Sequence, residues 1–299
     1  MNLINKIFEK FNLSFTWKGN QKKVIKNTID GLQLNQEKQS IATIYQIQNL
    51  TVNRIEELAC IDIPQDPNSL LKSAGQRFLV EQGIKQENFK NSVDKANLNE
   101  ISNPQEVEKD WFLKWMEISQ TVSREDVQNM LAKILSGEVK KSDSFSLRTL
   151  DILKNLSKQE LALFQIFCDI SYSLPGYGDA LTCVISEPFG SPGQNGMISL
   201  GLSYPALTIL QDAGLIQTDL NAWRKFQIPE MLKIPFMIGS TSYILRSTPE
   251  TVSTQPQVTI VNFTSAGLEL RSVLTIGSNS EYNSKFIEWI NSKFKMIPQ

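Results

Sequence analysis

Histidine is absent from this chain of 299 residues. Histidine supplies the general base of Ser-His-Asp and Cys-His sites and is a common ligand of catalytic zinc and non-haem iron, so these site classes are excluded. Cysteine is scarce as well: Cys60, Cys168 and Cys183 are an odd number without CxxC spacing, which indicates neither a disulfide framework nor a cysteine zinc site. We therefore expect no cofactor, and the remaining residues identify no reaction.

Long apolar runs are also missing. No stretch approaches the roughly 18 apolar residues that span a bilayer, and the N-terminus lacks the features of a secretory signal. We therefore expect a cytoplasmic protein without a transmembrane segment. With 41% apolar and 20% charged residues, the chain has the composition of a globular protein, and its length allows two domains.

No large excess of basic residues is present: 30 Lys and Arg stand against 31 Asp and Glu, for a net charge of −1. The only local excess lies near the N-terminus, where four lysines cluster: Lys18, Lys22, Lys23 and Lys26. Four lysines would make a weak, salt-sensitive contact with phosphate. The cluster is either a solvated helix face or an anion or nucleic-acid contact.

Residues 1–66 are expected to form an N-terminal helical region. Apolar residues recur at helical spacing in residues 3–11, which predicts a short amphipathic helix. We expect it to pack on the protein's own core or on a partner chain; the less favoured alternative is an anchor at a membrane surface. Residues 21–60 contain no proline and read as one long helix or two helices, ending before Pro64 and Pro67. A single long helix would exceed the breadth of a bundle, so we expect this region to mediate self-association.

Residues 67–172 are expected to form a central helical bundle. A helical stretch from Asn68 to about Ile101 is followed by Asn103-Pro104, typical of a helix start. Ser123 to Asp126 resembles a capping box, and the helix it opens should end at Gly137. Ser157 to Glu160 is a better box. Short capped helices with leucine-rich faces predict a compact bundle.

Residues 173–299 contain more glycine and proline and several short β-type runs, at 181–185, 234–238, 243–245 and 258–261. A helix over Tyr204–Asp212 precedes a Gly-Leu-Ile strand, and Phe263 to Leu270 resembles the last strand and following helix of a winged-helix domain. We therefore expect a mainly α protein whose C-terminal part is a winged-helix-like α+β module, with a final helix over 281–294.

Several sequence words between Glu81 and Leu156 carry a resemblance. They are EQGIKQEN (81–88), KDWF (109–112), VSREDVQ (122–128), AKILSGEV (132–139) and FSLRTLDILKNL (145–156). In this order and at this spacing they resemble the bacterial domain-of-unknown-function family 2806. The resemblance implies an architecture and no reaction. More loosely, the chain is similar to helical bacterial families linked to phage abortive infection, which suggests phage defence as a context.

Two polar constellations are candidate sites. Glu138-Val139-Lys140 has the ExK spacing of a metal-dependent nuclease, but it follows a helix and lacks an upstream strand aspartate, so we do not assign that activity. Arg148-Thr149 is bracketed by leucines within an apolar helix. Arg148 either bonds a carboxylate such as Glu138 or Glu125 and fixes two helices, or binds an anion or nucleotide.

The leading hypothesis is a non-enzymatic scaffold or regulatory interaction protein with a protein partner. The alternative is a sequence-nonspecific nucleic-acid-binding protein that uses the N-terminal lysines and four wing residues, Trp223, Arg224, Lys225 and Lys233. The helix over 203–212 lies where a recognition helix would be, yet it contains no Lys or Arg. We therefore expect residues 176–299 to dock protein or to be structural, and not to read DNA sequence.

Overall fold

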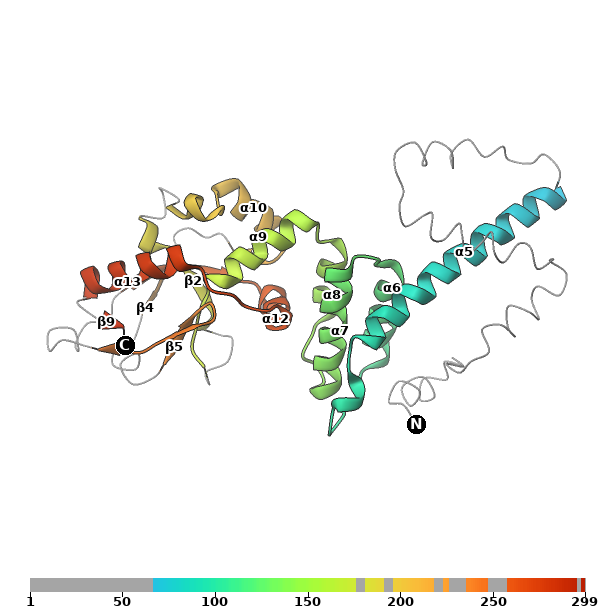
Figure 1. Cartoon of the computed structure of the whole chain (residues 1–299), viewed down its shortest axis with the longest axis horizontal. Helices are drawn as coiled ribbons and strands as arrows, with labels where there is room; N and C mark the ends of the chain where they lie inside the picture. The colour runs from blue at the N-terminus through green and yellow to red at the C-terminus, as the bar shows by residue number, and fades with distance from the viewer. Residues whose placement is uncertain are drawn as a thin grey trace. The chain divides into compact units, whose positions relative to one another are not determined.

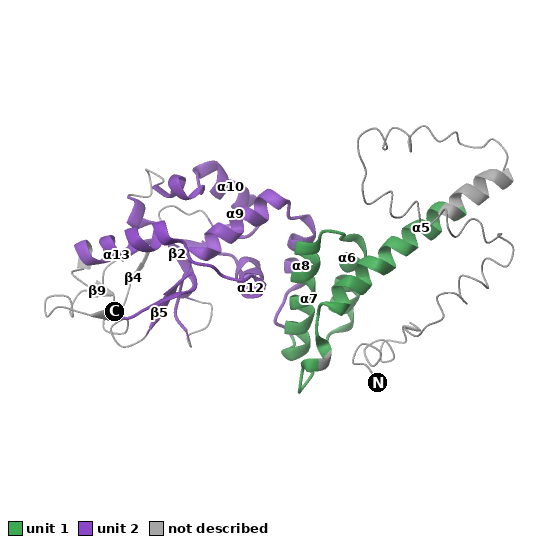
Figure 2. Cartoon of the chain, in the orientation of Figure 1, with its two compact units in different colours: residues 1–142 green, residues 143–299 purple. Residues whose placement is uncertain are grey.

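The computed structural model describes residues 67–175, 181–190, 196–217, 223–225, 235–246, 257–294 and 297–298 (Figure 1). The predictions for the N-terminal helices, for self-association and for the lysine cluster at residues 18–26 lie outside the described residues. The chain forms two compact units, residues 1–142 and residues 143–299 (Figure 2).

The first unit is built from α5 (Pro67–Asp94), the short η1 (Leu98–Glu100), α6 (Lys109–Thr121) and α7 (Glu125–Lys140). Its core centres on Trp115, which is fully buried and donates its indole N–H to the Leu131 carbonyl, 3.0 Å away. Phe112 stacks on Trp115 and Phe89 meets it edge-on. One aromatic side chain thus joins α5, α6 and α7, because Phe89 lies on α5 and Leu131 on α7.

Two helix starts differ from the sequence prediction. The α6 helix begins at Lys109 and not at Asn103-Pro104, since the chain runs non-helically there and the Gln105 N–H bonds to the Val139 carbonyl. The predicted capping box at Ser123 is wrong: α7 begins at Glu125 with Arg124 at the N-cap and no side-chain cap. The Ser123 hydroxyl instead accepts a hydrogen bond from Asn88.

The second unit combines helices with an antiparallel seven-stranded sheet and a separate antiparallel two-stranded sheet. Its helices are α8 (Leu147–Asn155), α9 (Lys158–Asp169), η3 (Glu187–Phe189), η5 (Gly196–Leu200), α10 (Tyr204–Asp212), α12 (Ser265–Val273) and α13 (Ser280–Phe294). Its strands are β1 (Tyr172–Ser173), β2 (Cys183–Ile185), β3 (Ile216–Gln217), β4 (Trp223–Lys225), β5 (Phe236–Ile238), β6 (Thr241–Tyr243), β7 (Leu245–Arg246), β8 (Gln257–Phe263) and β9 (Ile297–Pro298). The described chain is therefore a mixed α+β protein, as expected in outline.

Strand β8 pairs with three other strands of the sheet, whose order is β3-β8-β2-β1-β5-β6. Along one edge β8 pairs with β2, and it also pairs with β3 and, further along, with β4. The register places Cys183 opposite Asn262, Tyr172 opposite Cys183 and Ile238 opposite Tyr172. Since successive residues alternate between faces, Phe236 and Phe263 lie on opposite faces.

Helices cover both faces of this sheet. On one face, Phe236 and Tyr243 pack against Phe286 of α13. On the other, Phe263 meets Phe164 and Phe167 of α9 edge-on. The sheet is thus enclosed between α13 and α9, which explains why all three residues of β2 are buried.

The structure groups α8 and α9 with the sheet, whereas the sequence analysis assigned residues up to 172 to a central bundle. The reason is the packing of their apolar faces: α9 lies on Phe263 of β8, and α8 lies against α12. The Ser157 capping box of α9 is confirmed, with Ser157 and Glu160 each bonding the other's backbone N–H. The predicted helices over 204–212 and 281–294 are confirmed as α10 and α13.

Candidate functional site

Thr149 lies in a polar junction between α8 and α12. Ser146 caps α8, and its backbone N–H donates to Glu269 of α12 at 2.7 Å. The buried Thr149 hydroxyl donates to the same Glu269 oxygen at 2.6 Å. A carboxylate at the first turn of α8 also interacts favourably with the helix dipole. This arrangement fixes two helices of the second unit to each other.

Arg148, by contrast, is exposed on α8 and makes no ion pair among the described residues of its own unit. Thr149 therefore performs the helix-fixing task that the sequence analysis assigned to Arg148. Of the two acidic residues considered as partners for Arg148, Glu125 pairs with Lys95 at 3.3 Å. Glu138 is 2% exposed on the last turns of α7. Glu138 and Lys140 thus occupy a helix and not the strand that a nuclease ExK motif requires.

A second polar junction, which sequence reasoning missed, surrounds Asp169 at the end of α9. Its Oδ1 atom accepts from the Gly277 N–H at 2.6 Å and from the Gln165 side chain at 2.8 Å. Gly239 lies beside it with φ +56°, and a Cβ there would stand 2.1 Å from the Asp169 carbonyl oxygen. Asp169 thus joins the end of α9 to the loop before α13, and this loop in turn bonds the β5–β6 turn through Ser240.

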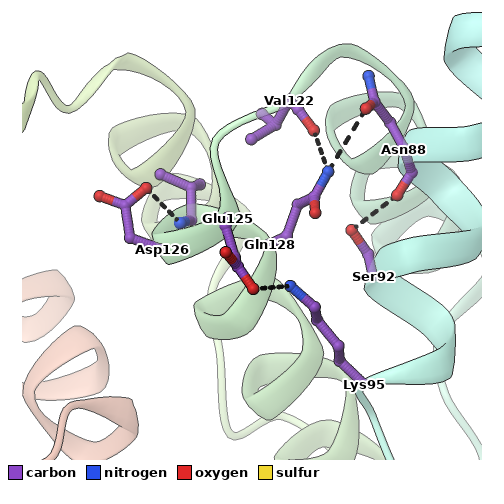
Figure 3. A network of polar contacts seen from close by, with 8 residues as sticks. Asn88, Ser92, Lys95, Val122, Glu125, Asp126 and Gln128 are labelled. Atoms are coloured by element: carbon purple, nitrogen blue, oxygen red, sulfur yellow. Dashed lines mark hydrogen bonds and ion pairs between the residues drawn. The ribbon is translucent and has the colours of Figure 1, made fainter.

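The first unit contains a buried amide network (Figure 3). The Asn88 side chain of α5 donates to the Gln120 carbonyl and to the Ser123 hydroxyl. Gln128 of α7 donates to the Val122 carbonyl at 2.9 Å and to the Asn88 side-chain oxygen. The carbonyls at the end of α6 therefore find donors on both neighbouring helices, as buried acceptors require.

The residues of the amide network lie in two of the sequence segments that carry the family resemblance. Asn88 ends the word EQGIKQEN, and Ser123 and Gln128 belong to the word VSREDVQ. A side-chain network between two helices requires particular residues in two segments that lie about 40 residues apart in the sequence. The structure supplies this physical reason, because the three residues bond to one another.

Ionisable side chains give little support for catalysis. Burial raises the pKa of the Cys168 thiol and of the Tyr282 phenol well above their ordinary values, and the Tyr282 hydroxyl donates to the Ile185 carbonyl. A hydrogen bond from Arg124 holds the pKa of the Asp126 carboxyl below its usual range. Among the described residues, no three Cys, Asp or Glu side chains gather closely enough to hold a metal ion.

The candidate nucleic-acid residues fall in different places. Arg224 and Lys225 lie on β4, where they pair with Val258 and Gln257 of β8, and Trp223 precedes them on the same strand. Lys233 and the N-terminal lysines lie outside the described residues. No helix in the described part of the chain has the length and apolarity of a bilayer span.

Among the residues of the second unit that the structure describes, the most exposed large apolar side chains lie on the η5–α10 surface. We define this surface by its exposed residues: Ile198, Ser199, Gly201, Tyr204 and Pro205. Ile198 is 65% and Tyr204 56% exposed, although α10 buries Leu207 and Leu210 on its other side. The Gly201 N–H bonds back to the Ile198 carbonyl, so a tight turn separates the two side chains. The whole segment 188–211 carries no charged residue.

Comparison with known proteins gives one match. Among curated proteins and among solved structures, nothing matches this chain. The model of one family, described as a protein of unknown function (DUF2806), matches residues 72–287, more than two thirds of the chain. The match includes the amide network, the α8–α12 junction and the η5–α10 surface. The family suspected from the sequence words is thus confirmed, and the chain belongs to the DUF2806 family.

Proposed function

We propose that this protein is a non-enzymatic interaction protein whose second unit binds a protein partner through the η5–α10 surface. The observation that carries the proposal is the exposure of Ile198 and Tyr204 within a segment free of charge. Neighbouring large apolar side chains on a surface are typical of protein interfaces, and tyrosine is enriched among the residues that dominate binding energy. The missing charge favours an apolar partner surface over a phosphate backbone.

The arrangement of strands around α10 supports a winged-helix-like reading of this region. In sheet order β2, β8 and β3 are neighbours, and α10 directly precedes β3 in the chain. This is the order expected when a helix leads into a pair of wing strands. The helix at the recognition position nevertheless has no Lys or Arg, and Asp212 at its end is exposed. A winged-helix-like module with such a helix is suited to contact protein and not base edges.

The test is capture of partners by the tagged full-length chain from its native host. We expect a protein that is retained by the unsubstituted chain and lost with Ile198→Asp. The matched control is Ile244→Asp, which places the same charge at another exposed isoleucine, 37% exposed and outside the η5–α10 surface. This control should retain the partner.

Nucleic-acid binding is the outcome that would contradict the proposal. In that case DNA or RNA would co-purify, retention would fall steeply with salt, and Ile198→Asp would have no effect. Arg224→Gln together with Lys225→Gln would then reduce retention.

The phage-defence context is part of the proposal and has its own test. Cells that express the chain are challenged with a panel of phages, and plaque numbers are compared between the unsubstituted chain and Ile198→Asp. Protection from phage that is lost with Ile198→Asp would show that the η5–α10 surface takes part in phage defence. Equal plaque numbers with and without the chain would remove the context and leave the interaction proposal to the capture experiment.

A further inference from the structure

The η5–α10 surface continues onto the neighbouring helix α9. The helices α9 and α10 lie side by side in the second unit (Figure 1). A Cβ at Gly201 would lie 3.9 Å from the Cδ1 atom of Ile166, which is half-buried on α9. Ala162, one turn earlier on the same side of α9, is exposed. Residues 161–168 carry no charge, so the uncharged surface extends over both helices.

Local contacts hold the backbone beneath the two most exposed side chains of this surface. Met197, next to Ile198 on η5, is buried, and its carbonyl accepts the Leu202 N–H at 3.2 Å. Tyr204 is the first residue of α10, and the Ser203 side chain caps this helix. Ile198 and Tyr204 therefore project from backbone that is already ordered, so an interface built on them loses little backbone entropy when it forms.

Charged residues stand only at the ends of this surface. On α9 the uncharged residues are bounded by Glu160 and Asp169. On α10 the first charged residue after Tyr204 is Asp212, roughly 12 Å along the helix at about 1.5 Å per residue. A surface with an excess of one charge repels its own copy, whereas an uncharged surface does not. The electrostatics of the η5–α10 surface therefore permit it to meet itself.

The composition of the surface favours a second copy over an unrelated protein. Interfaces between separately stable proteins are about as polar as the rest of the protein surface, and charges on them set orientation and association rate. Homodimer interfaces are more apolar, and charged residues are depleted from interface cores while tyrosine is enriched. The η5–α10 surface has this composition, since Ile198 and Tyr204 are its most exposed large apolar side chains. Two-fold dimers are also the commonest soluble oligomers.

We propose that the protein partner of the η5–α10 surface is a second copy of this chain, bound through the same surface on both copies about a two-fold axis. This inference rests on the proposed function, because it names the partner of that surface. In a two-fold interface each residue contributes twice, so one substitution changes both sides of the contact.

The experiment is sedimentation equilibrium of the purified full-length chain across a dilution series. We expect a reversible monomer–dimer equilibrium. Ile198→Asp places two carboxylates in one interface and should raise the dimer dissociation constant at least about 30-fold, the effect of a residue that dominates binding energy. Tyr204→Ser, which adds no charge, should raise it at least about fivefold. The matched control is Ile244→Asp, 37% exposed and outside this surface, which should leave it unchanged.

Hydrogen exchange locates the contact and checks that the variants are folded. Amides of residues 196–212 should exchange at least about fivefold more slowly above the dimer dissociation constant than below it. This dependence on concentration should disappear in Ile198→Asp, while the amides of β8 exchange as they do in the unsubstituted chain. If Ile198→Asp also accelerates exchange in β8, Tyr204→Ser decides the test.

Two results overturn this inference: a chain that stays monomeric, and a dimer that neither Ile198→Asp nor Tyr204→Ser weakens. With a monomeric chain, the proposed function still stands if a different protein is captured from the native host and is lost with Ile198→Asp. It fails together with the inference if no protein is captured. Binding of the monomer to neutral phospholipid vesicles, lost with Ile198→Asp, would replace the protein partner by a membrane surface.

Discussion

The amide network of the first unit joins helices through buried side chains, whereas at the Asp169 junction of the second unit the backbone of two loops closely approaches the end of a helix. Asn88 and Gln128 donate to the carbonyls where α6 ends, through side chains that reach across from the neighbouring helices. Around Asp169, by contrast, the backbone of Gly239 and Gly277 approaches so closely that no side chain fits at Gly239. The difference teaches that tolerance to substitution is set by whether a junction consists of side chains or of backbone.

The largest effect is expected from a pair of glycine substitutions that compare the two units directly. Gly239→Ala places a Cβ 2.1 Å from the Asp169 carbonyl oxygen at φ +56°, so we expect a loss of about 3–5 kcal/mol in unfolding free energy. Gly75→Ala lies in an α5 helix with open space around it and should stabilise by about 0.5–1 kcal/mol. Urea unfolding measures both. If Gly75→Ala lowers the unfolding free energy as much as Gly239→Ala does, the close backbone contact at Gly239 is not what distinguishes the two positions.

A smaller effect is expected from Trp115→Phe in the first unit. The substitution keeps an aromatic ring against Phe89 and Phe112 but removes the indole N–H that satisfies the Leu131 carbonyl, so we expect a loss of about 1–3 kcal/mol. Hydrogen exchange should show faster exchange in α5, α6 and α7. If the amides of β2 and β8 are affected to the same degree, the two units do not differ in the way described.

The second unit should be the one that is sensitive to alkaline pH. Burial raises the pKa of Tyr282 and of Cys168 in the folded state above their unfolded values. The stabilisation is complete below the unfolded pKa, which is about 10 for tyrosine. It is lost as pH rises further, because the unfolded state releases the proton more readily. Tyr282→Phe should flatten the decrease in melting temperature of the second unit above about pH 10. An unchanged slope would contradict this.

The smallest effect concerns acid sensitivity of the first unit. The hydrogen bond from Arg124 lowers the pKa of Asp126 in the folded state, so its contribution is present above the unfolded pKa of about 3.8 and is lost as pH falls through the folded pKa. Because both side chains are partly exposed, the contribution is small. Arg124→Gln should reduce the acid-induced loss of stability in α7, measured by hydrogen exchange at pH 5 and at about pH 3. Lys154→Gln in α8 serves as the control.

Sequence reasoning succeeded where the controlling contacts are local. The Ser157 box involves residues three positions apart, and it forms as predicted. The similar signal at Ser123 failed because Asn88, 35 residues earlier, bonds the Ser123 hydroxyl. A tertiary contact of this kind leaves no local pattern. The same holds for Thr149, which could be recognised as unusual in an apolar helix, while its partner Glu269 lies 120 residues away.

The grouping of helices was also beyond local reading. The apolar faces of α8 and α9 are predicted correctly as faces, but a leucine-rich face does not specify whether helix or sheet will cover it. Phe263, which covers part of α9, entered the sequence analysis only as the first residue of the winged-helix-like segment. The η5–α10 surface was half predicted: the absence of basic residues on α10 was visible, but the exposure of Ile198 was not.

The position of β8 has a consequence for the order in which the chain folds during its synthesis. It pairs with β2, β3 and β4, yet residues 257–263 are translated after all three of these strands. Until β8 leaves the ribosome, β2 and β3 have no strand between them. The first unit, whose described helices end at Lys140, is complete much earlier. Translation therefore presents a folded helical unit followed by a long incomplete one, and a stall before residue 257 would expose unpaired strands to aggregation.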